Sequence, residues 1–217
     1  MRTESLPSRR VSALRGIVGA AVIGILVFTY VIGIPRQGPS LFDFFGYFTN
    51  LTSLLACLIL LSTSLLGLRR RRVPAGLATA RAVATACMIV VALVYNLIVP
   101  GTGSAPAWVS LVLHTVFPLL LVLDWLCVGD RPPQPWRLLW LVLPYPMLWL
   151  LVVLGRGVTD GWVPYGFLLP ERGVVSLSTT VAALLVALLV AAAAVWALSR
   201  VPAPTSRVSP RSTRSGR

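Results

Sequence analysis

Long apolar segments alternate with short polar ones along the whole chain. A helix needs about 20 mostly apolar residues to cross the hydrocarbon core of a bilayer, and six segments meet that requirement. They span Leu14–Ile34, Phe42–Leu66, Ala78–Val99, Pro106–Val128, Trp136–Gly155 and Val174–Leu198. The pattern predicts an all-α, polytopic membrane protein with six transmembrane helices. Residues 14–198 form the transmembrane domain, residues 1–13 an N-terminal segment, and residues 199–217 a disordered basic tail.

The composition favours a membrane protein over a soluble one. Of the 217 residues, 57% are hydrophobic and 12% are charged, whereas a soluble domain carries about 25% charged residues. A net charge of +13 would suggest nucleic-acid binding in a soluble protein, but these charges lie between and beyond the apolar segments, so we expect no nucleic-acid partner. The three cysteines lack metal-ligand spacing and the chain has one histidine, so we predict neither a metal nor a cofactor.

The arginines predict an orientation. All 19 basic residues are arginine, and only Arg36, Arg156 and Arg172 lie in the first, third and fifth loops. The others lie in or beside the N-terminal segment, the even-numbered loops and the tail. Because positive charge is retained on the cytoplasmic side, both termini are expected there, in a multi-pass protein of the cell (inner) membrane. We interpret the tail arginines mainly as a topology signal, with contact to anionic lipid headgroups as the alternative.

One histidine, His114, lies inside the apolar run "LVLHTVFPLLLVLDW". Ionisable groups within a membrane are rare and normally face a cavity, which favours a functional role over a structural one. From the helical rise, His114 lies about 12 Å into the fourth span and Thr49 about 10 Å into the second, so both fall in the outer half of the bilayer. Asp124 is about 15 Å deeper and cannot orient the imidazole; we expect it to pair with a loop arginine.

Other polar residues fall near this level and predict a polar cavity above an apolar floor. They are Tyr30, Asn50, Thr52, Ser53, Tyr95, Asn96, Ser110, Ser178, Thr179 and Thr180. We take Asn50, Thr52, Tyr95, Asn96 and Ser110 as candidate substrate-binding residues. Pro118 has no N–H to give the carbonyl of His114, which predicts a kink. In the long fifth loop, Asp160 and Glu171 are the acids that could fold back toward the site.

Two stretches carry a family resemblance: "GYFTNLTSLLACLIL" (residues 46–60) and "LHTVFPLLLVLDW" (residues 113–125). They resemble motifs of the androgen-induced and androgen-dependent membrane proteins, multi-span hydrolases of fatty acid esters of hydroxy fatty acids, and of related bacterial six-span proteins. The resemblance implies that Thr49 is a nucleophile and His114 its partner base. The chain departs from the animal proteins at Asn50-Leu51-Thr52, where they are more apolar, so the same substrate is not implied.

Three functions remain open from the sequence. The leading hypothesis is an intramembrane hydrolase of lipid esters, in which His114 takes the proton of Thr49 and the hydroxyl attacks the ester carbonyl. The second is a transporter or channel with His114 as a proton site. The third is a non-enzymatic scaffold or lipid-binding protein, in which neither side chain reacts.

Overall fold

The computed structural model describes residues 7–204 and contains helices but no strands over that range. Six of these helical segments are long and apolar enough to cross a membrane, which confirms the predicted all-α architecture of six spans. The elements are α1 (Arg9–Gln37), α2 (Leu41–Gly46), α3 (Phe48–Leu68), α4 (Ala75–Leu97), α5 (Ala107–Leu111), η1 (Val112–Val116), α6 (Phe117–Cys127), η2 (Trp136–Val142), α7 (Pro144–Thr159), η3 (Gly166–Leu168), η4 (Pro170–Arg172) and α8 (Val174–Leu198).

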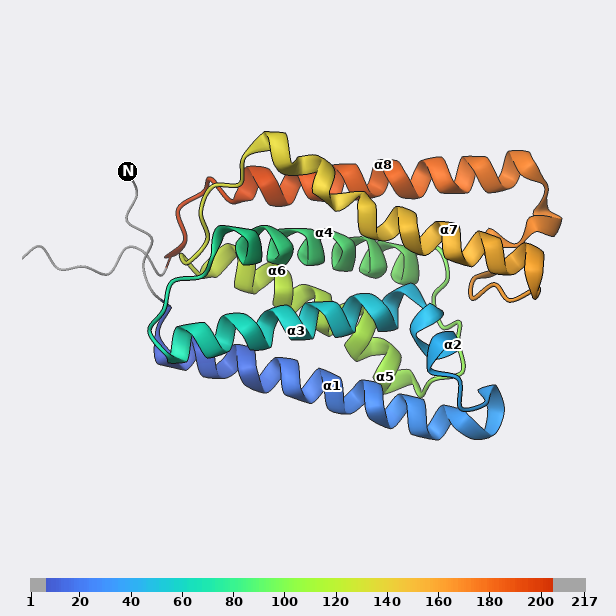
Figure 1. Ribbon diagram of the computed structural model, residues 1–217, viewed down its shortest axis with the longest axis horizontal. Helices are drawn as coiled ribbons and strands as arrows, with labels where there is room; N and C mark the ends of the chain where they lie inside the picture. The colour runs from blue at the N-terminus through green and yellow to red at the C-terminus, as the bar shows by residue number, and fades with distance from the viewer. Residues whose placement is uncertain (1–6, 205–217) are drawn as a thin grey trace, which may run out of the picture.

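The long helices run up and down side by side, and α1 begins at the end of the bundle where α8 ends (Figure 1). We call this the arginine end, since the Arg69–Arg72 loop also lies there. The opposite end, at the right of Figure 1, holds the last turns of α1, α4 and α7 and the first turns of α3, α5 and α8. Thr49 lies there, and we call it the threonine end.

Helix α4 is the centre of the bundle. The most apolar stretch of α4 is more buried than that of any of the other five long helices. Its residues belong to both apolar clusters of the core. Met88 and Val91 belong to the cluster shared with α1, α3 and α6. Ala86 and Val90 belong to the cluster shared with η2 and α8. Helix α4 presents small side chains such as Ala82 and Ala86 to its neighbours, so the helices can approach closely. Close packing of this kind can hold helices together where the hydrophobic effect does not.

Three predicted spans are not single α-helices. The fourth contains the π-helical turn η1 between α5 and α6. The second span, predicted from Phe42, is broken at Tyr47, whose backbone is extended between α2 and α3 (φ −70°, ψ 122°). The fifth begins with the 3-10 turn η2 and becomes α-helical only at Pro144. The break at Tyr47 positions the site, because it leaves Phe48 and Thr49 in the first turn of α3.

A cluster of four ionic side chains lies at the arginine end, in which Arg15, Arg81 and Asp130 are buried and Asp124 is half-buried. Arg15 bridges Asp124 (Nε–Oδ1 2.7 Å) and Asp130, and Arg81 bridges Asp130 (Nη2–Oδ1 2.8 Å). Asp124 therefore pairs with arginines of α1 and α4 instead of the expected loop arginine. Burial alone would raise the pKa of the Asp130 carboxyl. The hydrogen bonds from Arg15 and the charge of Arg81 nevertheless hold this pKa well below its usual range.

The chain ends differ from the predicted boundaries where they are described. Helix α1 begins at Arg9, inside the predicted N-terminal segment. The first residues of the predicted tail are packed, since Ser199 is buried and Arg200 donates to the carbonyl of Gln134. The rest of the predicted tail, residues 205–217, lies outside the described residues, as do residues 1–6.

Candidate functional site

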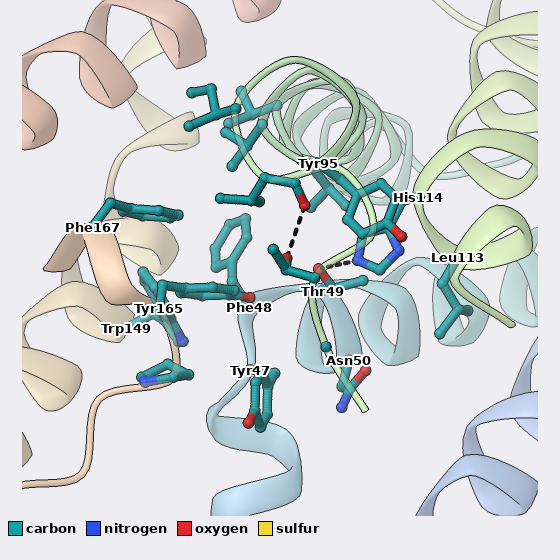
Figure 2. Close-up of a pocket in the computed structure, with 18 of the residues that line it drawn as sticks. Tyr47, Phe48, Thr49, Asn50, Tyr95, Leu113, His114, Trp149, Tyr165 and Phe167 are labelled. Carbon is teal, nitrogen blue, oxygen red and sulfur yellow. Dashed lines mark hydrogen bonds between the residues drawn. The ribbon is translucent and has the colours of Figure 1, made fainter. Parts of the chain in front are cut away.

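Thr49 and His114 meet at the threonine end, as their common level predicted. The Oγ1 of Thr49 is 3.3 Å from the Nε2 of His114 (Figure 2). Thr49 is nearly fully buried and His114 is half-buried. Their helices lie far apart in the sequence, so the contact is made by the packing of η1 against the first turn of α3.

The other ring nitrogen of His114 sets the role of Nε2. The Nδ1 lies 2.9 Å from the backbone carbonyl oxygen of Ser110, and a carbonyl only accepts hydrogen bonds. In the neutral ring the proton is therefore on Nδ1, and Nε2 accepts from the hydroxyl of Thr49. Tyr95 stacks on the imidazole with ring centroids 3.9 Å apart. The histidine thus presents a lone pair to Thr49 in a fixed orientation, which is the arrangement a general base requires.

The backbone around His114 is a π-helical turn, η1, between α5 and α6. The backbone N–H of Phe117 donates to the carbonyl of Val112, five residues earlier. Pro118 has no N–H for the carbonyl of His114, and the side chain of Asn96 supplies a donor instead (Nδ2–O 3.3 Å). The missing partner predicted from Pro118 is therefore provided by α4. Single π-helical turns inside α-helices are frequent at functional sites.

Thr49 and His114 line a cavity of about 580 Å³ at the threonine end, which is within the usual range of small-molecule sites. Most of its lining is apolar or aromatic and comes from α3, α4, α7 and α8, with Val91, Val94, Leu184 and Leu188 among it. A cavity is therefore present beside the pair, but its lining is mostly apolar, whereas the sequence predicted a polar cavity above an apolar floor. A chain of methylene groups fits such a lining better than a polar solute does.

The remaining candidates divide by position. Asn50, Tyr95 and Ser110 line the cavity with the pair, although the Asn50 amide donates to the carbonyl of Phe44. Asn96 is not among the residues that line the cavity, and its side chain donates to the backbone carbonyl of His114. Thr52 bonds to the hydroxyl of Tyr145 (2.7 Å) and lines a separate groove between α3 and α4. The hydroxyls of Ser178, Thr179 and Thr180 bond to carbonyls of their own helix.

Comparison with models of protein families, with curated proteins and with solved structures finds no match for this chain. The site must therefore be interpreted from its own geometry. Within residues 7–204, no group of three or more His, Cys, Asp and Glu side chains is arranged to hold a metal ion.

Several residues that line the cavity were missed by sequence reasoning, among them Trp149, Tyr165 and Phe167. Of the fifth loop, only the acids Asp160 and Glu171 were considered, but Asp160 pairs with Arg156 (2.8 Å) and Tyr165 instead folds back toward Thr49 (Figure 2). A signal for this segment was present in the sequence, since the loop contains the aromatic residues Trp162, Tyr165 and Phe167. Large apolar rings in a loop tend to pack against the protein.

Proposed function

We propose that this chain is an intramembrane hydrolase of lipid esters, with Thr49 as nucleophile and His114 as general base. The observation that carries the proposal is the hydrogen bond between Thr49 Oγ1 and His114 Nε2, with Nδ1 held by the carbonyl of Ser110. A nucleophile, a base and a group that orients the base are the three parts of an activated hydroxyl. The 3.3 Å separation is consistent with a substrate-free site that tightens on binding.

The cavity supports a lipid as the substrate. Its apolar wall, made by α4 and α8, lies beside the polar pair, so an acyl chain can lie along the wall while the ester carbonyl reaches Thr49. The resemblance of residues 46–60 and 113–125 to motifs of lipid ester hydrolases agrees with this assignment. No cofactor is needed for the reaction, since the alcohol, the base and water suffice.

The proposed reaction has two halves. In the first, His114 Nε2 takes the proton of Thr49 as Oγ1 bonds to the ester carbonyl carbon, and the resulting tetrahedral intermediate expels the alcohol, which takes the proton from the imidazolium. In the second, His114 takes a proton from water, and the hydroxide attacks the acyl-threonine. The acid then leaves, and Thr49 regains its proton from the imidazolium.

The test is ester turnover and fluorophosphonate labelling of the purified full chain in lipid nanodiscs. Thr49→Ala is expected to abolish labelling, and both Thr49→Ala and His114→Ala should lower turnover of acyl esters by at least about 1000-fold. Thr63→Ala is the matched control, because Thr63 is a buried threonine of the same helix that bonds only to carbonyls of α3. Undiminished turnover in Thr49→Ala would reject the mechanism. His114-dependent proton uptake into liposomes without ester turnover would favour the transporter.

We further propose that the arginine end faces the cytoplasm of a bacterial-type cell membrane, with the site opening toward the outer leaflet. The Arg69–Arg72 loop, Arg131 and Arg137 lie at that end, and positive charge is retained on the cytoplasmic side. Arginines there can contact anionic headgroups. A tag at either terminus should react with an impermeant reagent only after lysis, and reaction in intact cells would contradict this orientation.

A further inference from the structure

The segment from Asp160 to Arg172, which we call the strap, closes over the threonine end between α7 and α8 (Figure 1). Arg156 ties its first residue to the rest of the bundle, because the guanidinium bridges both Asp160 and Asp43 of α2 (2.8 and 2.6 Å). Pro164, Tyr165 and Phe167 line the cavity. The strap is thus a wall of the site and not a free loop.

Tyr165 is the residue that the strap brings nearest to the reacting pair. Its ring packs edge-on against Tyr47 (centroids 6.0 Å apart) and stacks on Phe167 (5.2 Å). Its hydroxyl points toward Thr49 (Figure 2). Tyr165 and Thr49 line the same cavity.

The hydrogen bond to His114 fixes which atom donates between Tyr165 and Thr49. Thr49 Oγ1 gives its single proton to His114 Nε2. Toward any other neighbour Oγ1 can therefore only accept, so a hydroxyl beside it, such as that of Tyr165, is the donor.

We infer that Tyr165 is a further catalytic residue, whose hydroxyl donates a hydrogen bond to the oxyanion formed when Thr49 attacks the ester carbonyl. The inference rests on the proposed function. In the tetrahedral intermediate, Oγ1 and the oxyanion are bound to the same carbon atom, so a donor beside Oγ1 is beside the oxyanion as well. The proton of Tyr165 stays on the phenol throughout, while the oxyanion gains charge as Oγ1 bonds and loses it as the alcohol leaves.

Two properties suit the hydroxyl to this role. Burial raises the pKa of Tyr165 to about 12, so the hydroxyl keeps its proton at any physiological pH. The packed ring holds the donor in place before the charge develops, and prepositioned donors stabilise a transition state without reorganisation. By contrast, the side-chain amides of Asn50 and Asn96 each already donate to a backbone carbonyl.

The test compares Tyr165→Phe with Tyr145→Phe in the full chain. Both changes delete only a hydroxyl. That of Tyr165 points toward Thr49 in the cavity, whereas that of Tyr145 bonds to Thr52 away from it. Tyr165→Phe is expected to lower kcat for ester hydrolysis about 100-fold with little change in KM. Tyr145→Phe should leave kcat unchanged. Equal kcat in Tyr165→Phe and wild type would overturn the inference and leave the proposed function standing.

A second measurement covers the case in which Tyr165→Phe fails to fold. A 3-fluorotyrosine incorporated at position 165 keeps the ring and the hydroxyl but makes the phenol a stronger donor, so kcat is expected to rise. An unchanged kcat with that residue overturns the inference. Absence of Thr49-dependent turnover in the wild type would overturn the proposed function, and this inference with it.

Discussion

Gly46, at the end of α2, is the position where one added methyl group should disconnect the strap. A Cβ at Gly46 would lie 2.3 Å from Cη2 and 2.9 Å from Cζ3 of Trp162. The Trp162 ring also stacks on the guanidinium of Arg156, whose Cζ is 4.2 Å from the ring centroid, and it meets Tyr47 edge-on. The ring is therefore held by Arg156 and Tyr47 as well as by the close approach to Gly46.

The size of the effect follows from these distances. Ordinary van der Waals contact begins at 3.4 Å, so Gly46→Ala forces Trp162 outward by about 1.1 Å, the difference between 3.4 and 2.3 Å. Tyr165 is three residues from Trp162 on the same strap. A misplacement of about 1 Å at a reacting centre can lower the rate about 100-fold. We therefore expect Gly46→Ala to reduce kcat by roughly that factor, while Thr49 and His114 remain in place.

The assay is steady-state ester hydrolysis in nanodiscs, with thermal unfolding measured on the same samples. Gly155→Ala is the matched control, because a Cβ at this glycine of α7 meets no atom within 4 Å. It is expected to retain full activity and to gain about 0.5–1 kcal/mol in stability, as alanine does over glycine in a helix. Full activity in Gly46→Ala would refute the reasoning that the docking of Trp162 on Gly46 positions the strap.

Two further predictions concern other parts of the fold. Asn96→Leu removes the donor to the carbonyl of His114; we expect kcat to fall about tenfold, as for partners that orient a functional group from behind, and unaltered pH–rate profiles and kcat would argue against it. Asp130→Asn leaves Arg15 and Arg81 without their shared carboxylate and should cost about 3–5 kcal/mol in the free energy of unfolding at neutral pH. Because the folded-state pKa of Asp130 is lowered, its stabilisation is present above the unfolded pKa of about 4 and is lost as the pH falls through the folded value. Thermal unfolding of both proteins across that range checks the prediction, and equal stability at pH 7 would contradict it.

The six helices could be predicted because apolar length alone specifies a span. The pairing of Thr49 with His114 could also be predicted from the sequence, since each residue lies in a short motif and both lie at a similar distance from the start of their spans. The depth count placed the two residues at one level, where they do meet, even though its starting point was wrong. It treated residues 42–66 as one helix, whereas the chain breaks at Tyr47, and no proline marks that break.

Other parts of the site depend on contacts that a linear pattern does not contain. Pro118 indicated that the carbonyl of His114 lacks a partner, but not that Asn96 of α4 supplies one, because depth does not give helix rotation. The close approach of Trp162 to Gly46 joins two residues more than 100 positions apart, and no local pattern marks it. Asp124 was assigned to a loop arginine because Arg15 and Arg81 were counted only as topology signals.

The arginine–aspartate cluster has a consequence for the order in which the protein is assembled during synthesis. Arg15 and Arg81 enter with the first and third spans, but their shared partner Asp130 follows the fourth. Until more than half of the chain has left the ribosome, these two guanidinium groups have only water and headgroups to solvate them. The early helices can therefore insert one by one yet stay loosely associated. The emergence of residues 124–130 is then the event that draws α1 and α4 together, before the last two spans complete the cavity.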